Sequence, residues 1–163
     1  MTKYKIKKWD PSTLKPHARY LFIGRSGGGK TVAMRHVLYE LRKSVDLTIC
    51  FAPSLAAKKA FSRMLPAQLM FDSLDLSTLE KALELQNELL ANKKERSVLA
   101  VCDDCAFEKQ VWRSSTIRKV FMQGRHSKLG IALSMQYLMD VSPDLRTNVS
   151  YVFATADAIH QNI

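Results

Sequence analysis

The chain has 163 residues, of which 47% are hydrophobic, and a formal net charge of +10. This is enough apolar material for the core of one domain. The sequence has no apolar run near the ~20 residues that cross a membrane and no apolar signal-peptide stretch, so we expect a soluble protein. The positive charge favours a polyanionic partner, nucleic acid first, although a basic surface that only maintains solubility has the same composition.

Residues 1–15 are expected to form a basic N-terminal arm on a single domain that spans residues 1–163. Lysines alternate with Tyr4 and Ile6 in this arm, which puts the lysines on one face of an extended segment. An edge strand, a basic arm and a mobile tail all fit this pattern.

Short apolar runs then alternate with helical patterns, which is typical of an α/β fold with a mainly parallel central sheet flanked by helices. Buried parallel strands are expected to be nearly all apolar and to be followed by polar residues. Five runs meet this description, at residues 20–24, 46–51, 97–102, 130–135 and 149–154. Helical spacing after the first run puts four apolar residues on one face: Met34, Val37, Leu38 and Leu41.

A helical insertion is expected at residues 53–96, between the second and third of these strands. Residues 56–65 have a helical pattern, and residues 69–72 fit a short extra strand. Ser77 begins a capping box, Ser-Thr-Leu-Glu, which predicts the start of a helix that runs to about Ala91.

A phosphate-binding loop is indicated between the first strand and the first helix. The segment Gly24-Arg-Ser-Gly-Gly-Gly-Lys-Thr31 matches Gly-x-x-x-x-Gly-Lys-Ser/Thr at every fixed position. Glycines let backbone N–H groups turn toward phosphates, and the helix adds the positive end of its dipole. Lys30 is expected to reach the β- and γ-phosphates, and Thr31 to ligate Mg²⁺. We expect nucleotide contacts from Gly24, Arg25, Ser26, Gly27, Gly28, Gly29, Lys30, Thr31 and Val32.

Two adjacent carboxylates, Asp103 and Asp104, follow the third strand. Adjacent carboxylates repel each other unless a cation lies beside them, so we expect Asp103 to hold Mg²⁺ and Asp104 to orient or deprotonate an attacking water. A plain polar strand end is the alternative. The sequence lacks the guanine-specifying pattern Asn-Lys-x-Asp, which favours ATP over GTP.

Gln136 follows the fourth strand, where a polar amide could sense the γ-phosphate or help to hold the water. A solvated glutamine is the alternative. Cys102 and Cys105 form a Cys-x-x-Cys pair, but no second ligand pair lies nearby, so we interpret them as a strand residue and a loop neighbour and not as a redox or zinc motif.

Together these motifs resemble the genome-packaging ATPases of poxviruses and other large DNA viruses, within the FtsK/HerA group of DNA-pumping motors. The resemblance covers about residues 16–153. Besides the loop and the two aspartates, it rests on Gly124-Arg-His126, Leu133-Ser-Met-Gln136 and Leu145-Arg-Thr-Asn148.

The resemblance implies a RecA-like P-loop NTPase fold and a homo-oligomeric ring with ATP between neighbours. An arginine from the next subunit would then stabilise the negative charge of the transition state. Arg125 and Arg146 are the candidates, with a slight preference for Arg146. The family domain usually continues past residue 163, so we expect either a fragment or a compact relative.

The implied function is an ATP-driven translocase that packages a viral double-stranded DNA genome into capsids, with ATP and Mg²⁺ as cofactors. DNA binding would be independent of sequence, a capsid or portal protein would be a partner, and the location would be the host cytoplasm or the virion. Two alternatives stay open: a nucleotide-gated binding or assembly module with little hydrolysis, and a small-molecule P-loop kinase. The kinase is disfavoured because the insertion is not rich in the arginines of a kinase lid.

Overall fold

The structure is a computed structural model that describes residues 7–105 and 111–155. Its centre is one six-stranded sheet with the order β3-β2-β4-β5-β1-β6, in which all neighbouring strands are parallel. The α/β fold and its parallel sheet are therefore confirmed, including the short extra strand. The strands are β1 (Arg19–Ile23), β2 (Leu47–Phe51), β3 (Met70–Phe71), β4 (Val98–Cys102), β5 (Leu129–Met135) and β6 (Tyr151–Ala154).

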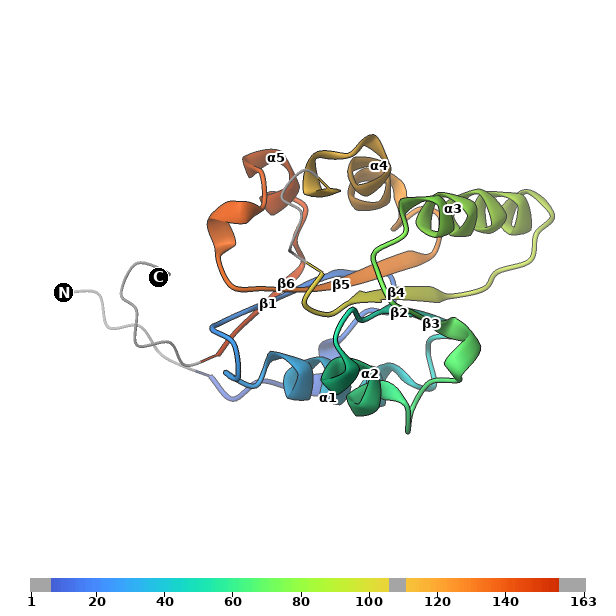
Figure 1. Cartoon of the computed structure of the whole chain (residues 1–163). Coiled ribbons are helices and arrows are strands. Elements are labelled where there is room, and N and C mark those ends of the chain that lie inside the picture. Colours follow the sequence, from blue (N-terminus) through green and yellow to red (C-terminus); the bar gives the residue numbers. More distant parts are fainter. Residues whose placement is uncertain (1–6, 106–110, 156–163) are drawn as a thin grey trace.

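Helices cover both faces of this sheet. In Figure 1, α1 and α2 lie on one face, and α3, α4 and α5 lie on the other. The helices are α1 (Lys30–Leu41), α2 (Leu55–Phe61), α3 (Leu76–Ala91), α4 (Ser115–Gln123) and α5 (Pro143–Arg146). Short 3-10 turns lie at Pro11–Thr13, Ala67–Leu69, Val111–Arg113 and Leu138–Asp140.

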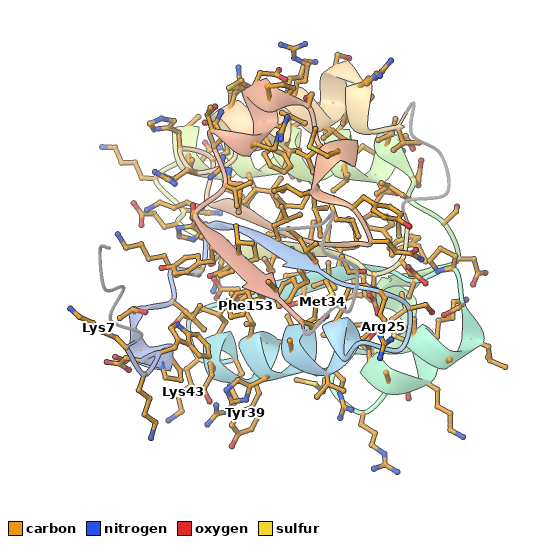
Figure 2. All side chains as sticks on the ribbon, turned by 90° about the vertical axis from the view of Figure 1, so that its left-hand side faces the viewer. Lys7, Arg25, Met34, Tyr39, Lys43 and Phe153 are labelled. Atoms are coloured by element: carbon orange, nitrogen blue, oxygen red, sulfur yellow. The ribbon has the colours of Figure 1, made fainter. Side chains whose placement is uncertain are left out.

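Each face of the sheet has its own hydrophobic core. Beneath α1 and α2, Phe22 packs with Met34 and Phe61, and Figure 2 shows Met34 on the sheet side of α1 with Tyr39 and Lys43 pointing away. The predicted apolar face of α1 is confirmed, since all four of its members are buried. The other core joins β4 and β5 to residues of α3, α4 and α5, among them Leu79, Ile117, Val120 and Leu145.

The insertion at 53–96 differs from the sequence expectation at two helix ends. The helix expected over 56–65 ends at Phe61. The capping box expected at Ser77 is wrong, because the carboxylate of Asp75 accepts hydrogen bonds from the backbone N–H groups of Ser77 and Thr78 at 3.0 and 3.2 Å. An aspartate two residues earlier satisfies the free N–H groups, and the helix begins at Leu76.

Of the expected N-terminal arm, residues 1–6 lie outside the described residues. In the described part, Trp9 packs edge-on against His36 and Phe153, with ring centroids 6.1 and 5.4 Å apart. A 3-10 turn follows, capped by Asp10. This part of the arm therefore lies against α1 and β6. No helix in residues 7–105 or 111–155 has the length and apolar character to cross a bilayer.

Candidate nucleotide-binding site

The loop between β1 and α1 is shaped by glycines. Gly29 caps α1 in a left-handed conformation, with φ = 92°, which only glycine adopts readily. At Gly24, a Cβ atom would lie 1.7 Å from the Thr155 Oγ1 atom just after β6, so a side chain cannot fit. The loop thus follows β1 tightly and leads into the positive end of the α1 dipole.

Lys30 is the first residue of α1, and only 6% of it is exposed. Its amine donates hydrogen bonds to the backbone carbonyls of Gly24 and Arg25, at 2.8 and 3.0 Å. The ammonium group is therefore held over the loop by acceptors that an arriving phosphate could replace.

A hydrogen-bonded chain joins this loop to the end of β4. Thr31 Oγ1 donates to Asp103 Oδ2 at 2.7 Å, and Ser134 Oγ donates to Asp103 Oδ1 at 2.6 Å. The backbone N–H of Asp104 donates to the same Ser134 hydroxyl at 2.8 Å. Asp103 is buried, whereas Asp104 is half-buried and has a left-handed backbone with φ = 57°, a conformation that aspartate tolerates better than most residues. The turn therefore buries the carboxylate of Asp103, with both oxygens hydrogen-bonded, and leaves the carboxylate of Asp104 partly exposed.

A cavity of about 450 Å³, the loop cavity, opens beside this chain. Eight of the residues expected from the sequence line it: Ser26, Gly27, Gly29, Lys30, Thr31, Val32, Asp103 and Asp104. Its remaining wall was not predicted and comes from α1 and the start of the insertion: Arg35, Ser54, Ala56, Ala57 and Ala60. Gly24, Arg25 and Gly28 belong to the loop but do not line the cavity.

Gln136 lies at the same edge of the sheet as the loop but outside the loop cavity. It is the first residue after β5, and β5 lies between β1 and β4. The backbone N–H of Gly24 donates to the carbonyl of Met135 at 3.2 Å, so Gln136 comes next to the start of the loop. Its side chain is exposed.

The two candidate arginines lie away from the loop cavity. Arg125 precedes β5, at the edge where the parallel strands begin, and donates to Ser150 Oγ at 3.0 Å. Arg146 ends α5, with Nη1 3.6 Å from Met139 Sδ. Neither arginine lines the cavity of its own chain.

The cysteines have no feature of a redox or zinc site. All three thiols are free and buried. Burial, and secondarily the charge of Asp103, raises the pKa of Cys50 and Cys105 to about 12, and burial also raises that of Cys102. Thiols with raised pKa values are poor nucleophiles and metal ligands. Among the described residues, no group of three or more His, Cys, Asp or Glu side chains is arranged to hold a metal.

Ser134 is a member of the site that the sequence motifs did not predict, although it lies in the segment Leu133-Ser-Met-Gln136. The available signal was a hydroxyl inside an otherwise apolar strand. A buried polar side chain needs a partner, and Asp103 is that partner.

The fold and the loop together define a P-loop NTPase domain. More particularly, the chain belongs to the Poxvirus A32 protein family, whose sequence pattern matches residues 7–162.

Relatives of the chain occur in several viruses. Protein 075L of Invertebrate iridescent virus 6 is 25% identical over 170 residues, which cover 98% of this chain and 66% of that protein. Protein L437 of Acanthamoeba polyphaga mimivirus is 24% identical over 170 residues, covering 98% and 60%. The chain thus spans less than two thirds of the length of these relatives.

Two solved structures share the fold. The genome packaging NTPase B204 from Sulfolobus turreted icosahedral virus 2, in complex with ATP-gammaS, has a TM-score of 0.65 and 15% identity and aligns with 91% of this chain and 79% of its own. The cytoplasmic domain of EssC has a TM-score of 0.67 and 15% identity, with coverages of 91% and 34%. At this identity the similarity establishes the fold alone.

Proposed function

We propose that this protein is an ATPase that drives the packaging of viral double-stranded DNA into capsids. Membership of the Poxvirus A32 protein family supports the proposal, as does the shared fold with a viral genome packaging NTPase. The observation that carries the ATPase part of the proposal is the hydrogen bond from Thr31 to Asp103, which joins the phosphate-binding loop to the acidic strand end beside Lys30.

ATP would bind with its phosphates along the loop of residues 24–32. Lys30 would neutralise charge on the β- and γ-phosphates. Thr31 and Asp103 fit Mg²⁺, because a hydroxyl and a carboxylate oxygen, which are ligands that Mg²⁺ prefers, lie 2.7 Å apart at the loop cavity. When bound, Mg²⁺ would supply positive charge beside the phosphates.

Asp104 would orient the attacking water or accept its proton. It lines the loop cavity, and its backbone is fixed by the hydrogen bond to Ser134. Gln136, next to the start of the loop, would respond to the presence of the γ-phosphate.

The working assembly would be a homo-oligomeric ring through which double-stranded DNA passes without sequence preference. A neighbouring subunit would contribute Arg125 or Arg146 to the ATP of the next subunit, because neither arginine lines the loop cavity of its own chain. A capsid or portal protein would receive the DNA, in the host cytoplasm or in the virion. The net charge of +10 supports contacts with the DNA backbone.

The deciding experiment measures ATP hydrolysis with and without double-stranded DNA over a range of protein concentrations. We expect turnover to rise with DNA and with concentration, and to fall at least about a hundredfold in Asp104→Asn. Tight ATP binding without hydrolysis at any concentration would instead identify a nucleotide-gated assembly module. Turnover that is unchanged in Lys30→Ala would refute an active site at this loop.

A further inference from the structure

A second polar cavity, the arginine cavity, lies at the opposite edge of the sheet, where the strands begin. Its volume is about 360 Å³. Two segments that were singled out in the sequence, Gly124-Arg-His126 and Leu145-Arg-Thr-Asn148, meet at this cavity. Its polar lining residues include Arg19, Arg125, His126, Asn148 and Ser150, and no carboxylate is among its described lining residues.

Arg19 is the unusual member of this cavity. It begins β1 and is only 2% exposed. Its two terminal nitrogens donate to the carbonyls of His17 and Val120, each at 3.0 Å, while its Nε atom is buried without a partner among the described residues. Burial, and then the nearby charge of Arg125, lowers the pKa of Arg19 to about 10, so it remains charged at neutral pH. A buried cation without a counter-ion is costly, and an anion would offset that cost.

Arg125 and Ser150 also bring hydrogen-bond donors to the arginine cavity. Ser150 Oγ accepts from Arg125 Nη2 at 3.0 Å and from the backbone N–H of Arg19 at 3.5 Å, which leaves the hydroxyl proton of Ser150 free to donate. Guanidinium and hydroxyl groups that face one space without a carboxylate are typical of a phosphate-binding site.

A neighbouring cavity of about 330 Å³ shares Arg125 and Ser150 with the arginine cavity. Its other described lining residues are Lys15, His17, Ala18 and Tyr151, again without a carboxylate. The two cavities together form a basic surface larger than a single phosphoryl group, and this surface suits two adjacent phosphoryl groups.

We infer that the arginine cavity and its neighbour form a second phosphate-binding site, which takes adjacent phosphoryl groups through Arg19, Arg125 and Ser150. The groups belong to the backbone of a DNA strand, so the inference rests on the DNA contact of the proposed function and gives that contact a place in the fold. The five residues of β1, at about 3.3 Å each, separate this site from the loop by ~16 Å. The site does not depend on ATP hydrolysis at the loop of the same chain.

The first arm of the test uses Lys30→Ala protein, so that binding at the loop is disabled. Binding of a fluorescent DNA duplex of mixed sequence is measured by anisotropy at several salt concentrations. Adding Arg125→Gln should weaken binding about tenfold and reduce the salt slope by about one, because a phosphate contact is lost. Arg63→Gln removes the same charge from an exposed position just after α2 and should have little effect. Arg125 is exposed, so its replacement should leave the melting temperature unchanged.

The second arm mixes Lys30→Ala subunits with Arg125→Gln subunits. Recovered ATP turnover would mean that Arg125 of one copy serves the nucleotide on another. Loss of duplex binding in the first arm supports the inference. Recovered turnover in the second arm, with duplex binding unchanged in the first, would overturn it, because Arg125 would then serve a nucleotide and not DNA. If Arg125→Gln binds duplex as Arg63→Gln does, the inference is wrong whether or not mixing restores turnover. If the wild-type protein has no ATPase activity, the proposed function fails separately and the duplex arm alone decides.

Discussion

Ser134 Oγ lies 2.6 Å from Asp103 Oδ1, so a serine inside a buried strand orients the carboxylate that faces the phosphate-binding loop. The second oxygen of Asp103 accepts from Thr31, which leaves both oxygens engaged. The same serine hydroxyl accepts from the backbone N–H of Asp104. One side chain of β5 thus fixes a carboxylate and the left-handed residue beside it.

Ser134→Ala should reduce ATP turnover about tenfold or more, because a hydrogen bond to a charged group contributes about 1.5–3 kcal/mol. The loss should be larger at low Mg²⁺, since Asp103 would no longer be held toward Thr31. Turnover measured against Mg²⁺ concentration checks this. Ser127→Ala is the matched control, because this buried serine donates to Asn87 Oδ1 at 2.6 Å, at the other edge of the sheet. If Ser134→Ala and Ser127→Ala reduce ATP turnover equally, Ser134 has no specific role in positioning Asp103.

Gly24→Ala should destabilise the domain by about 1–3 kcal/mol and reduce nucleotide affinity, because the new methyl group overlaps Thr155 Oγ1. Urea unfolding and nucleotide titration measure the two effects. Thr155→Ala removes the clashing oxygen and should restore part of both losses in the double variant. If the losses of stability and affinity in the double variant equal the sum of the losses in the two single variants, the contact with Thr155 is not the reason that residue 24 must be glycine.

Gln86→Leu should lower the free energy of unfolding by about 1–3 kcal/mol. Gln86 is buried in α3, and its amide donates to the backbone carbonyls of Arg96 and Lys128, at 2.9 and 3.0 Å. These residues precede β4 and β5, so the amide links the starts of two central strands. An apolar replacement removes the amide donor from the Arg96 carbonyl, whereas the Lys128 carbonyl still accepts from the backbone N–H of Val98 at 3.0 Å. Urea unfolding with the exposed change Gln123→Leu as control measures the cost. Equal unfolding midpoints would show that water replaces the amide.

The stability of the fold should fall as the pH rises above about 9, the ordinary pKa of a thiol. Burial raises the pKa of Cys50 and Cys105 to about 12, so the folded chain retains protons that the unfolded chain releases. This contribution is fully present below pH 9 and is lost as the pH approaches 12. Urea unfolding at pH 8 and pH 10.5 should therefore show a smaller drop for a Cys50→Ala, Cys105→Ala variant than for the wild-type chain. Equal drops would assign the alkaline loss to other groups.

The sequence predicted the elements of the fold better than the details of the site. The strands were predictable because short, nearly continuous apolar runs are typical of parallel strands that are buried on both faces of a sheet. The helix start at Asp75 was not, because Asp75 and Ser77 are both good caps and only the folded backbone decides between them. Burial of Arg19 was equally hidden, since an arginine that begins a strand usually reaches solvent.

The loop residues themselves were predictable from local pattern, because backbone sterics and phosphate chemistry demand those residue types at that spacing. The wall formed by Ser54, Ala56 and Ala60 was not, because nothing in the insertion indicates that it packs beside the loop. Such contacts depend on how segments far apart in the chain meet.

The position of β1 in the sheet has a consequence for synthesis. In the described part of the chain, β1 pairs with β5 and β6, through Arg19 with Ile131 and Tyr20 with Tyr151, although it precedes all the other described strands in the sequence. A nascent chain that has reached the end of β4 already contains every residue from Gly24 to Thr31, but neither neighbour of β1. Pairings between distant segments form slowly. We therefore expect the loop between β1 and α1 to emerge from the ribosome early and to acquire its folded conformation late.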